Sequence, residues 1–209
     1  MAEHNIEIVS VDKDALDFLK VIYFGAITDP YEAAAFRAYR DFSRTLRFGE
    51  MEDVARINLR KQTAGILRER ISDIAEEAHV TQDSFDNWHK ETCASIRIPY
   101  VNAGIELSWG QAQKWLNMTI KYLYIVGTCS FDGIFQFCHI PVDNYVFKIA
   151  KKELGVPIPK VSWSRWSDYD GQYMTYQKEL RSRIKGYDPL RWEFKYWMKE
   201  ARNLTDENQ

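Results

Sequence analysis

The chain has 209 residues, of which 45% are hydrophobic, 14% aromatic and 28% charged, and its formal net charge is −2. A chain of this length buries about 70% of its unfolded surface, so folding requires neither a metal ion nor a disulfide. The composition excludes global disorder, and no apolar run reaches the roughly 20 residues that span a membrane. The acidic start lacks the apolar core of a signal peptide, and three cysteines are too few for a disulfide framework. We therefore expect a cytoplasmic protein with reduced thiols, without a metal ion or another cofactor.

Apolar residues recur at intervals of three and four along most of the chain, and glycine and proline are few, with 10 and 6 residues. Both features favour helices. β-type alternation is not sustained, and the one strand candidate is IEIVSV at residues 6–11. The predicted helices cover, in chain order, about residues 16–23, 30–48, 50–78, 81–98, 108–127, 143–155, 176–184 and 189–202.

Local signals mark several ends of these helices. Asp29 precedes Pro30, a residue that the first helical turn tolerates. Ser108 and Gln111 form a capping box, in which each side chain binds the backbone amide of the other residue. Pro99 begins an expected break before this capping box, because proline interrupts helix hydrogen bonding.

The chain length fits one large domain or two small interlocked ones. No internal repeat or low-complexity segment divides the sequence. We predict an all-α fold of about eight to ten helices in a single compact unit of residues 1–209. Its two lobes would be the N-terminal helices of residues 1–98 and a second, motif-bearing part of residues 99–209.

The near-zero net charge is a sum of segments of opposite sign. Residues 37–70 carry nine Arg and Lys against five Asp and Glu, and residues 176–202 carry eight against four. Residues 71–92 carry one Lys against six acidic residues. In the first segment, arginines that step by three or four positions share a helix face: Arg37, Arg40, Arg44 and Arg47. Such a face is either solvated or follows a phosphate backbone.

Two motifs lie between residues 107 and 155. The first, L-S-W-G-Q-A-Q-K-W-L-N, contains Lys114, and the second, P-V-D-N-Y-V-F-K-I-A-K-K-E-L-G, contains Asp143. This segment of about 50 residues resembles the helix-hairpin-helix DNA glycosylases, whose patterns are L-P-G-V-G-x-K-x-x-N and V-D-T-H-V-x-R-x-x-x-R-L-G. The interval of 29 residues between the lysine and the aspartate is closer to the archaeal 8-oxoguanine glycosylase branch than to the endonuclease III-like branch.

The match is carried by residues spread over both patterns. The sequence departs from the first pattern at Ser108, where proline would stand, and from the second at Asn144, which follows the aspartate. Lys148 replaces a basic residue of the second pattern. The matching residues are Gly110, Lys114, Asn117, Val142, Asp143, Val146, Leu154 and Gly155.

The resemblance implies a DNA glycosylase with abasic-site lyase activity, in which the lysine is the nucleophile and the aspartate its essential partner. Lys114 would attack the sugar C1′ as a neutral amine and form a Schiff base. Asp143 would accept a proton or stabilise positive charge as the base leaves. The implied partner is damaged or base-modified DNA, in repair or as foreign DNA, with no membrane and no obligate protein partner.

A glycosylase must take its target base out of the stack, because the glycosidic bond is inaccessible in a duplex. Enzymes of this kind hold the base between aromatic side chains and read its edge with polar groups. The candidate substrate-binding residues are Trp109, Gln111, Gln113, His139, Trp163 and Trp166, and the candidate nucleic-acid contacts are Gly110, Lys148 and Arg165.

Each candidate also has a simpler interpretation. An aspartate before a helix is most often an N-cap, a lysine on an amphipathic helix is most often solvated, and a tryptophan or histidine is often part of the core. The alternative function is therefore a non-catalytic helical protein that binds nucleic acid or another partner on a glycosylase-like scaffold. Convergence of Lys114 and Asp143 in one cleft beside a basic groove would favour the enzyme.

Other site classes lack their motifs. The spacing of Cys129, Cys138 and His139 fits no zinc pattern, and a fourth ligand is missing. The glycine-rich signatures of nucleotide phosphate loops are absent from the sequence. No histidine lies five to seven residues after an arginine, which excludes the all-α ribonucleases with that motif.

Overall fold

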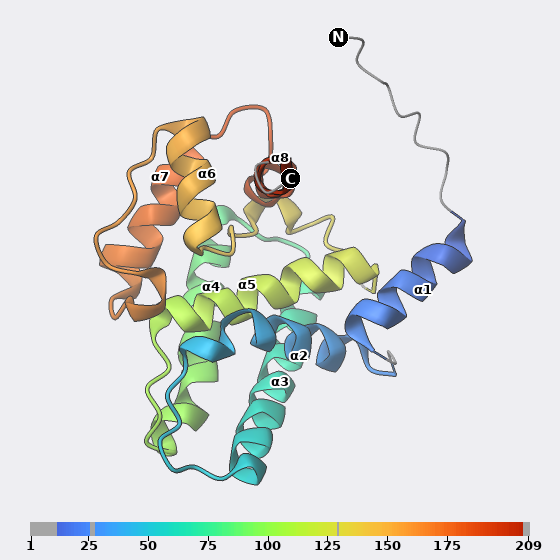
Figure 1. Ribbon diagram of the computed structural model, residues 1–209, viewed down its shortest axis with the longest axis vertical. Helices are drawn as coiled ribbons and strands as arrows, with labels where there is room; N and C mark the ends of the chain where they lie inside the picture. Colours follow the sequence, from blue (N-terminus) through green and yellow to red (C-terminus); the bar gives the residue numbers. More distant parts are fainter. Residues whose placement is uncertain (1–11, 26–27, 129, 207–209) are drawn as a thin grey trace.

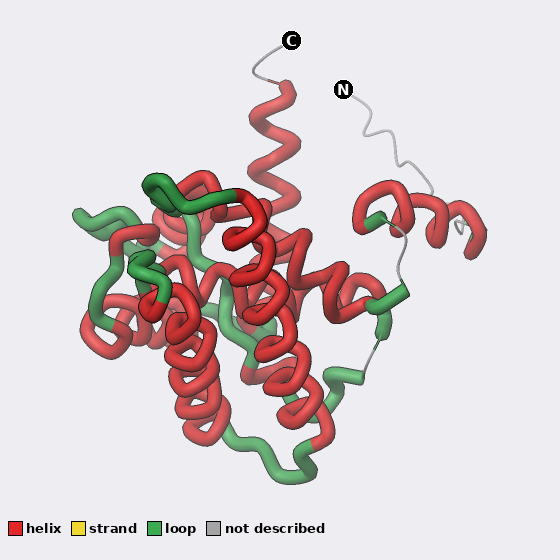
Figure 2. The backbone as a smooth tube through the Cα atoms, turned by 90° about the horizontal axis from the view of Figure 1, so that it is seen from below, coloured by secondary structure: helices red, strands yellow, loops and turns green. Residues whose placement is uncertain are grey.

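A computed structural model describes residues 12–25, 28–128 and 130–206. This part of the chain forms α-helices and short 3₁₀ or π-helical turns, and it contains no strand, so the all-α prediction is confirmed (Figure 2). The strand candidate at residues 6–11 lies outside the described residues. The elements are α1 (Lys13–Phe24), α2 (Pro30–Phe42), η1 (Ser43–Thr45), α3 (Asp53–Glu76), α4 (Gln82–Asn102), α5 (Trp109–Val126), η2 (Phe135–Phe137), α6 (Asn144–Leu154), η3 (Trp163–Arg165), η4 (Tyr169–Met174), α7 (Thr175–Arg183) and α8 (Pro189–Asp206).

The predicted start of α2 at Pro30 and the predicted capping box of α5 are confirmed. The Asp29 carboxylate accepts from the amide of Tyr31 at 3.0 Å. The Ser108 hydroxyl accepts from the amide of Gln111 at 3.1 Å, and the Gln111 side-chain oxygen accepts from the amide of Ser108 at 2.8 Å. Local sequence signals therefore locate these helix starts, because the side chains that satisfy the first-turn amides are their immediate neighbours.

The end of α2 lies earlier than predicted. The helix ends at Phe42 rather than near Phe48, and one 3₁₀ turn follows. The Thr45 hydroxyl donates to the carbonyl of Phe42 at 2.8 Å, and the Leu46 amide donates to the carbonyl of Ser43 at 3.0 Å. Hydroxyl side chains that bond the backbone locally compete with the helix, which explains the early end.

The break predicted at Pro99 begins one turn later than expected. α4 runs through Pro99 and ends at Asn102. The proline ring lacks an amide hydrogen, yet its fixed φ suits a helix, and Pro99 is buried. The chain leaves the helix at Gly104, whose φ of 73° favours glycine.

Helix α5 lies at the centre of the fold, and residues 110–123 are all buried. α2 packs along it, and α4 and η3 contact it as well (Figure 1). The buried small residues Ala34, Ala35 and Ala38 let α2 approach closely, and the indole of Trp115 donates to the carbonyl of Ala35 at 2.9 Å. Because α2 and α5 belong to the two predicted lobes, these lobes share one core.

The first helix stands beside this core rather than inside it. No residue of α1 is buried, and Figure 1 shows it projecting from one side of the molecule. Its C-terminal end is attached through Tyr23 and Phe24, which pack against Tyr122. Their ring centres lie 5.9 and 5.4 Å from the ring centre of Tyr122. None of the described helices is long and apolar enough to cross a membrane.

Two glycines in helices should respond in opposite ways to substitution by alanine. A Cβ on Gly110 would lie 1.6 Å from the carbonyl oxygen of Trp163, whereas a Cβ on Gly65 in α3 would meet no atom within 4 Å. We expect Gly110→Ala to lower the free energy of unfolding by about 2 kcal/mol or more, because of overpacking. Gly65→Ala should raise it by roughly 0.5–1 kcal/mol through helix propensity. Urea unfolding followed by circular dichroism measures both, and equal stabilities would contradict the close approach of α5 and η3.

Candidate active site

A cleft of about 620 Å³ opens between the α1–α2 side of the molecule and α8. Its volume is typical of a site for a small ligand or a single nucleotide. α5 contributes Lys114, Met118, Lys121 and Ile125, whose spacing places them on one face of the helix. The N-terminal end of α6 contributes Asp143. The cleft therefore joins segments that lie far apart in the sequence.

Lys114 and Asp143 meet in this cleft. The distance from Lys114 Nζ to Asp143 Oδ2 is 2.7 Å, and Nζ also lies 3.4 Å from the carbonyl oxygen of Pro141. Lys114 is only 4% exposed. A buried ammonium group requires a counter-charge, because desolvation strongly penalises an isolated charge. The predicted proximity of the two side chains is confirmed.

The two carboxylate oxygens of Asp143 have separate partners. Oδ1 accepts from the amide of Val146 at 2.9 Å and caps α6, while Oδ2 accepts from Lys114. Burial alone would raise the pKa of Asp143, but the charge and hydrogen bond of Lys114 and the α6 amides outweigh it, so the pKa lies below its usual value. Asp143 is therefore an N-cap and also an ionised partner of Lys114 at neutral pH.

Gln113 holds the backbone next to Asp143. Its side-chain amide donates to the carbonyl of Val142 at 2.9 Å, and its side-chain oxygen accepts from the amide of Val142 at 3.2 Å. It also donates to the carbonyl of Gly110 at 2.9 Å. Gln113 is completely buried. It positions the segment that carries Asp143, and it does not reach the cleft as a reader of a base edge.

A buried polar network continues from Gln113 behind α5. Asn117 donates to the Gln113 oxygen at 3.1 Å and to the Tyr173 hydroxyl at 2.9 Å, and its own oxygen lies 2.9 Å from Nε2 of His89. Nδ1 of His139 lies 2.8 Å from the Tyr173 hydroxyl. His139 is buried within this network, outside the cleft that contains Lys114.

Neutral imidazoles complete the network. The pKa of His89 and that of His139 are lowered, in both cases chiefly by burial. Nε2 of His139 lies 2.7 Å from Asp86 Oδ1, and Arg181 binds both Asp86 oxygens at 2.8 and 2.7 Å. Burial tends to raise the pKa of Asp86, but the hydrogen bonds of Arg181 and His139 hold it well below its usual range. His139 therefore donates from Nε2 to the carboxylate and accepts at Nδ1 from the tyrosine.

The structure does not bring the predicted tryptophans into the cleft. Trp163 is 6% exposed and Trp166 is 1% exposed, and both belong to the core because η3 packs on α5. Trp109 is half-buried beneath Arg97, whose guanidinium carbon lies 4.1 Å from the ring centre. Gln111 is buried, and it donates to the carbonyl and the hydroxyl of Thr45 at 3.1 and 2.9 Å.

The three predicted nucleic-acid contacts lie in different surroundings. Gly110 is buried, and its amide is directed at the carbonyl of Trp166, so it is not open to a phosphate. Lys148 is exposed beside the cleft-lining Tyr145, with Nζ 5.9 Å from the ring centre. Arg165 is exposed and lines a second hollow of about 730 Å³, together with Arg44.

Among the cleft residues that sequence reasoning missed, four carry a charge or an exposed ring that bears on the chemistry: Lys121, Tyr145, Glu193 and Trp197. Lys121 binds both oxygens of Glu193 at 2.8 and 2.7 Å, and Glu193 is almost fully buried. The spacing of seven residues from Lys114 to Lys121 predicts the same helix face, and this signal was present in the sequence. Tyr145 and Trp197 are 39% and 36% exposed, with ring centres 5.7 Å apart. They form an aromatic wall of the cleft.

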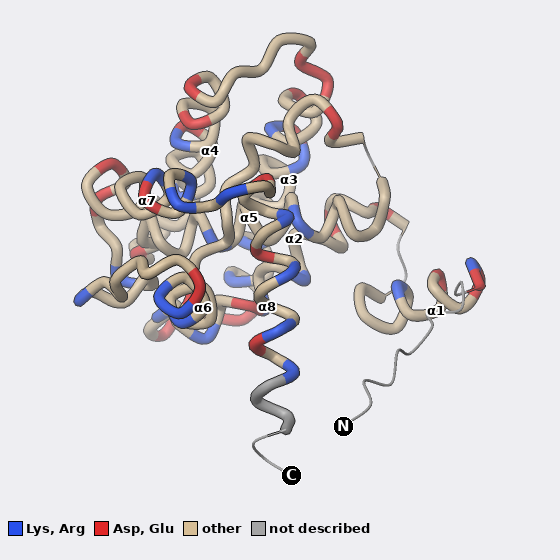
Figure 3. The backbone as a smooth tube through the Cα atoms, turned by 90° about the horizontal axis from the view of Figure 1, so that it is seen from above, with Lys and Arg blue, Asp and Glu red and all other residues tan. Residues whose placement is uncertain are grey.

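The α2 side of the cleft keeps positive charge. Arg37 pairs with Asp41 at 3.4 Å. Arg40 and Arg44 are exposed, line the cleft, and make no ion pair with any residue that the structure describes. Figure 3 shows that charges of both signs are distributed over the helices. Two positive charges are thus available at the cleft for an anionic ligand.

Comparisons of the chain with models of protein families, with curated proteins and with solved structures found no match. The chemistry of the cleft therefore has to be inferred from its own side chains. Their arrangement combines a buried lysine with an ionised aspartate, an aromatic wall and two arginines that have no carboxylate partner among the described residues. Such a set suits a ligand that carries both an anionic group and a planar apolar group.

Folding should become less favourable below about pH 6.5. His89 and His139 have lowered pKa values in the folded state, so the unfolded chain binds more protons below the ordinary histidine value near 6.5. The free energy of unfolding should then fall as pH falls, by up to about 1.4 kcal/mol per pH unit for each histidine. Urea unfolding between pH 8 and pH 5 measures the slope. A flat profile in wild-type protein would contradict neutral burial of the two imidazoles.

A double-mutant cycle should reveal strong coupling between Lys114 and Asp143. Asp143→Asn retains a cap for α6 but removes the counter-charge, so we expect the free energy of unfolding to fall by about 2 kcal/mol. Lys114→Met leaves an unpaired carboxylate and should also destabilise the protein. The double variant should be closer to wild type than the sum of the single effects predicts, because no charge is left unpaired. Additive losses in chemical unfolding would show that the pair is not coupled.

Proposed function

We propose that the protein is a DNA glycosylase with abasic-site lyase activity, with Lys114 as the nucleophile and Asp143 as its partner. The observation that carries this proposal is the 2.7 Å pair that they form in the cleft. Asp143 caps α6 without help from Lys114, so the cap does not explain why the Lys114 amine is buried beside it. A lysine beside a carboxylate in a cleft is the arrangement that attack on a sugar C1′ requires.

The chemical step can be written with all protons and electrons accounted for. Lys114 loses a proton, and the lone pair of Nζ attacks C1′ of the deoxyribose. A bond forms between Nζ and C1′ while the glycosidic bond breaks, and the base leaves with the bonding electron pair and the proton. Transfer of a second Nζ proton to O4′ as the C1′–O4′ bond breaks opens the sugar ring and leaves a protonated Schiff base. A water molecule then takes a proton from C2′, and the 3′ phosphate leaves with the electron pair of the C3′–O bond, which cleaves the strand. Ionised Asp143 stabilises the positive charge that develops on the sugar.

The walls of the cleft suit the two other parts of a nucleotide. Tyr145 and Trp197 present exposed rings on which an extruded base can stack. Arg40 and Arg44 supply positive charge for the flanking phosphates. In this proposal Tyr145 and Trp197 hold the base, a role that the sequence analysis predicted for Trp163 and Trp166. Arg40 and Arg44 contact the phosphates, a role that it predicted for Gly110.

One observation favours the alternative, a non-catalytic protein that binds nucleic acid or another partner. The first turn of α5 is packed under η3, where the amide of Trp109 donates to the carbonyl of Trp166 at 3.0 Å. Gly110 contacts Trp163 at the same place. The glycine hairpin of the glycosylase pattern is therefore replaced by a packing contact. A scaffold of this kind would keep the basic cleft without the reaction.

Reduction with borohydride distinguishes the two functions. A Schiff base between Lys114 and the sugar would be reduced to a stable amine, which links protein to DNA. We expect wild-type protein to form this linked species with at least one duplex from a panel of damaged, modified and abasic substrates. Lys114→Gln should abolish linkage, and Asp143→Asn should reduce it at least tenfold. Denaturing electrophoresis of labelled DNA measures both effects.

The matched control for this experiment is Lys61→Gln on α3. Lys61 is exposed and does not line the cleft, so its variant should be trapped like wild type. Trapping that persists in Lys114→Gln would exclude Lys114 as the nucleophile. If wild-type protein forms no linked species with any duplex but releases a free base, the lyase activity is absent; if it does neither, the non-catalytic alternative holds.

A further inference from the structure

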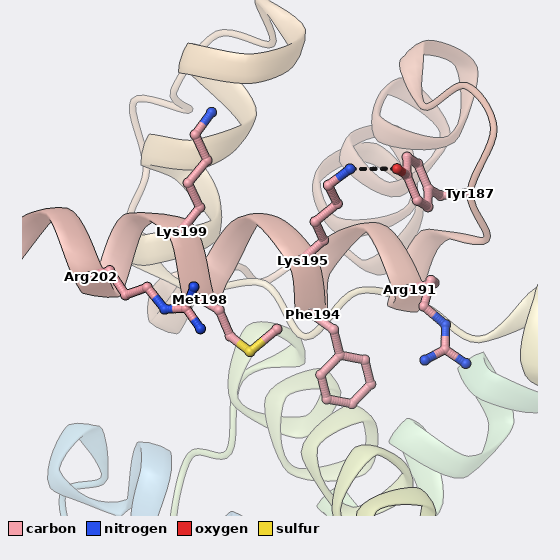
Figure 4. A pocket seen from close by; sticks show the side chains of 7 residues that line it. All are labelled: Tyr187, Arg191, Phe194, Lys195, Met198, Lys199 and Arg202. Carbon is pink, nitrogen blue, oxygen red and sulfur yellow. Dashed lines mark hydrogen bonds between the residues drawn. The ribbon is translucent and has the colours of Figure 1, made fainter. Parts of the chain in front are cut away.

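A row of basic side chains follows α8 on the side away from the buried Glu193. Arg191, Lys195 and Lys199 are exposed and lie four residues apart, which corresponds to about 6 Å along a helix. They line a hollow of about 610 Å³ together with Tyr187, as Figure 4 shows. We call the residues Arg191, Lys195 and Lys199 the α8 stripe.

Uncharged phenol groups hold two members of the stripe. Arg191 donates to the Tyr124 hydroxyl at 2.7 Å, and Lys195 donates to the Tyr187 hydroxyl at 2.5 Å. Only the third member, Lys199, has a carboxylate partner among the described residues, Glu153 at 3.0 Å. The stripe therefore keeps most of its positive charge, and tyrosine contacts orient two of its side chains.

The acidic residues of this stretch of α8 do not neutralise the stripe. Glu193 binds Lys121 in the cleft, and Glu200 binds Lys152 of α6 at 3.1 Å. Both carboxylates are therefore bound by lysines that do not belong to the stripe.

The stripe is continuous with the cleft. Phe194 and Met198 line both the cleft and the hollow beside the stripe. A nucleic-acid strand that leaves the cleft across Phe194 and Met198 would next meet the α8 stripe. The aromatic wall and the stripe thus lie along one path over α8.

We propose that the α8 stripe is a second nucleic-acid surface, which binds the backbone phosphates of the strand that leaves the cleft. This inference rests on the proposed function for the identity of the partner as DNA. Three exposed cations that follow one another at intervals of four residues along α8 match a linear polyanion, whose phosphates follow one another along the strand. A membrane surface would instead favour cations spread around a broad apolar face.

The salt dependence of DNA binding tests the stripe separately from catalysis. The probe is a fluorescent duplex of 25 base pairs that contains a tetrahydrofuran abasic analogue, titrated at 50–300 mM KCl and followed by anisotropy. Arg191→Gln/Lys195→Gln should reduce the slope of log K against log[salt] by about 2, because each lost phosphate contact contributes about 0.9. It should also weaken binding at least tenfold at 100 mM salt.

The matched control is Lys61→Gln/Lys178→Gln, which removes the same net charge from exposed lysines that line neither hollow. We expect this control to bind with the wild-type slope. Equal slopes for both double variants would overturn the proposal, because the effect would then come from net charge alone. A single Lys195→Glu variant repeats the test, and thermal unfolding verifies that each variant is folded.

Two further outcomes separate this proposal from the proposed function. If wild-type protein forms the borohydride-linked species but the stripe variant binds like wild type, only the stripe assignment fails. If the stripe variant loses affinity, and wild-type protein neither forms the linked species nor releases a base from any duplex, the stripe assignment stands and the proposed enzyme activity fails. Binding to phosphatidylglycerol vesicles without binding to DNA would overturn the stripe as a nucleic-acid surface.

Discussion

The burial of a charged lysine in the central helix is the constraint on which the site depends. Lys114 lies in the second turn of α5, where every neighbouring position is buried. An ammonium group at such a place must be matched by a carboxylate, and Asp143 supplies it. The carboxylate in turn has to be held at the start of α6, and the surrounding polar network serves that purpose.

That network explains why so many polar groups are buried behind α5. Gln113 binds both backbone groups of Val142, and Asn117 continues the network to the tyrosine and histidine side chains. Each of these donors has an acceptor, so the hydrogen bonds offset the free-energy cost of removing the groups from water. A polar core of this kind fixes the segment of residues 139–143 more sharply than apolar packing would. The Lys114–Asp143 distance is consequently set by groups that do not line the cleft.

The cleft is assembled from segments near opposite ends of the chain. α2 supplies cations on one side of the cleft, and α8 supplies the aromatic wall with Tyr145 of α6. The ion pair of Lys121 with Glu193 attaches α8 to α5. The cleft and the hollow beside the α8 stripe are both lined by α8. Phe194 and Met198 line the cleft as well as that hollow. A nucleic-acid partner would contact both sides of this helix.

Local chemistry in the sequence determined most of the helices and the capping box at Ser108, whereas the pairing of Lys114 with Asp143 was implied by the resemblance of their two motifs to a family pattern. Those features depend on neighbours within a few residues or on a motif that spans one helical hairpin. The roles of Trp163, Trp166 and His139 were decided only by tertiary structure, because burial depends on what packs against a side chain from elsewhere in the chain. For the same reason Tyr145 and Trp197 could not be recognised as neighbours: 52 residues separate them in the sequence, and only the docking of α8 on α6 brings their rings together.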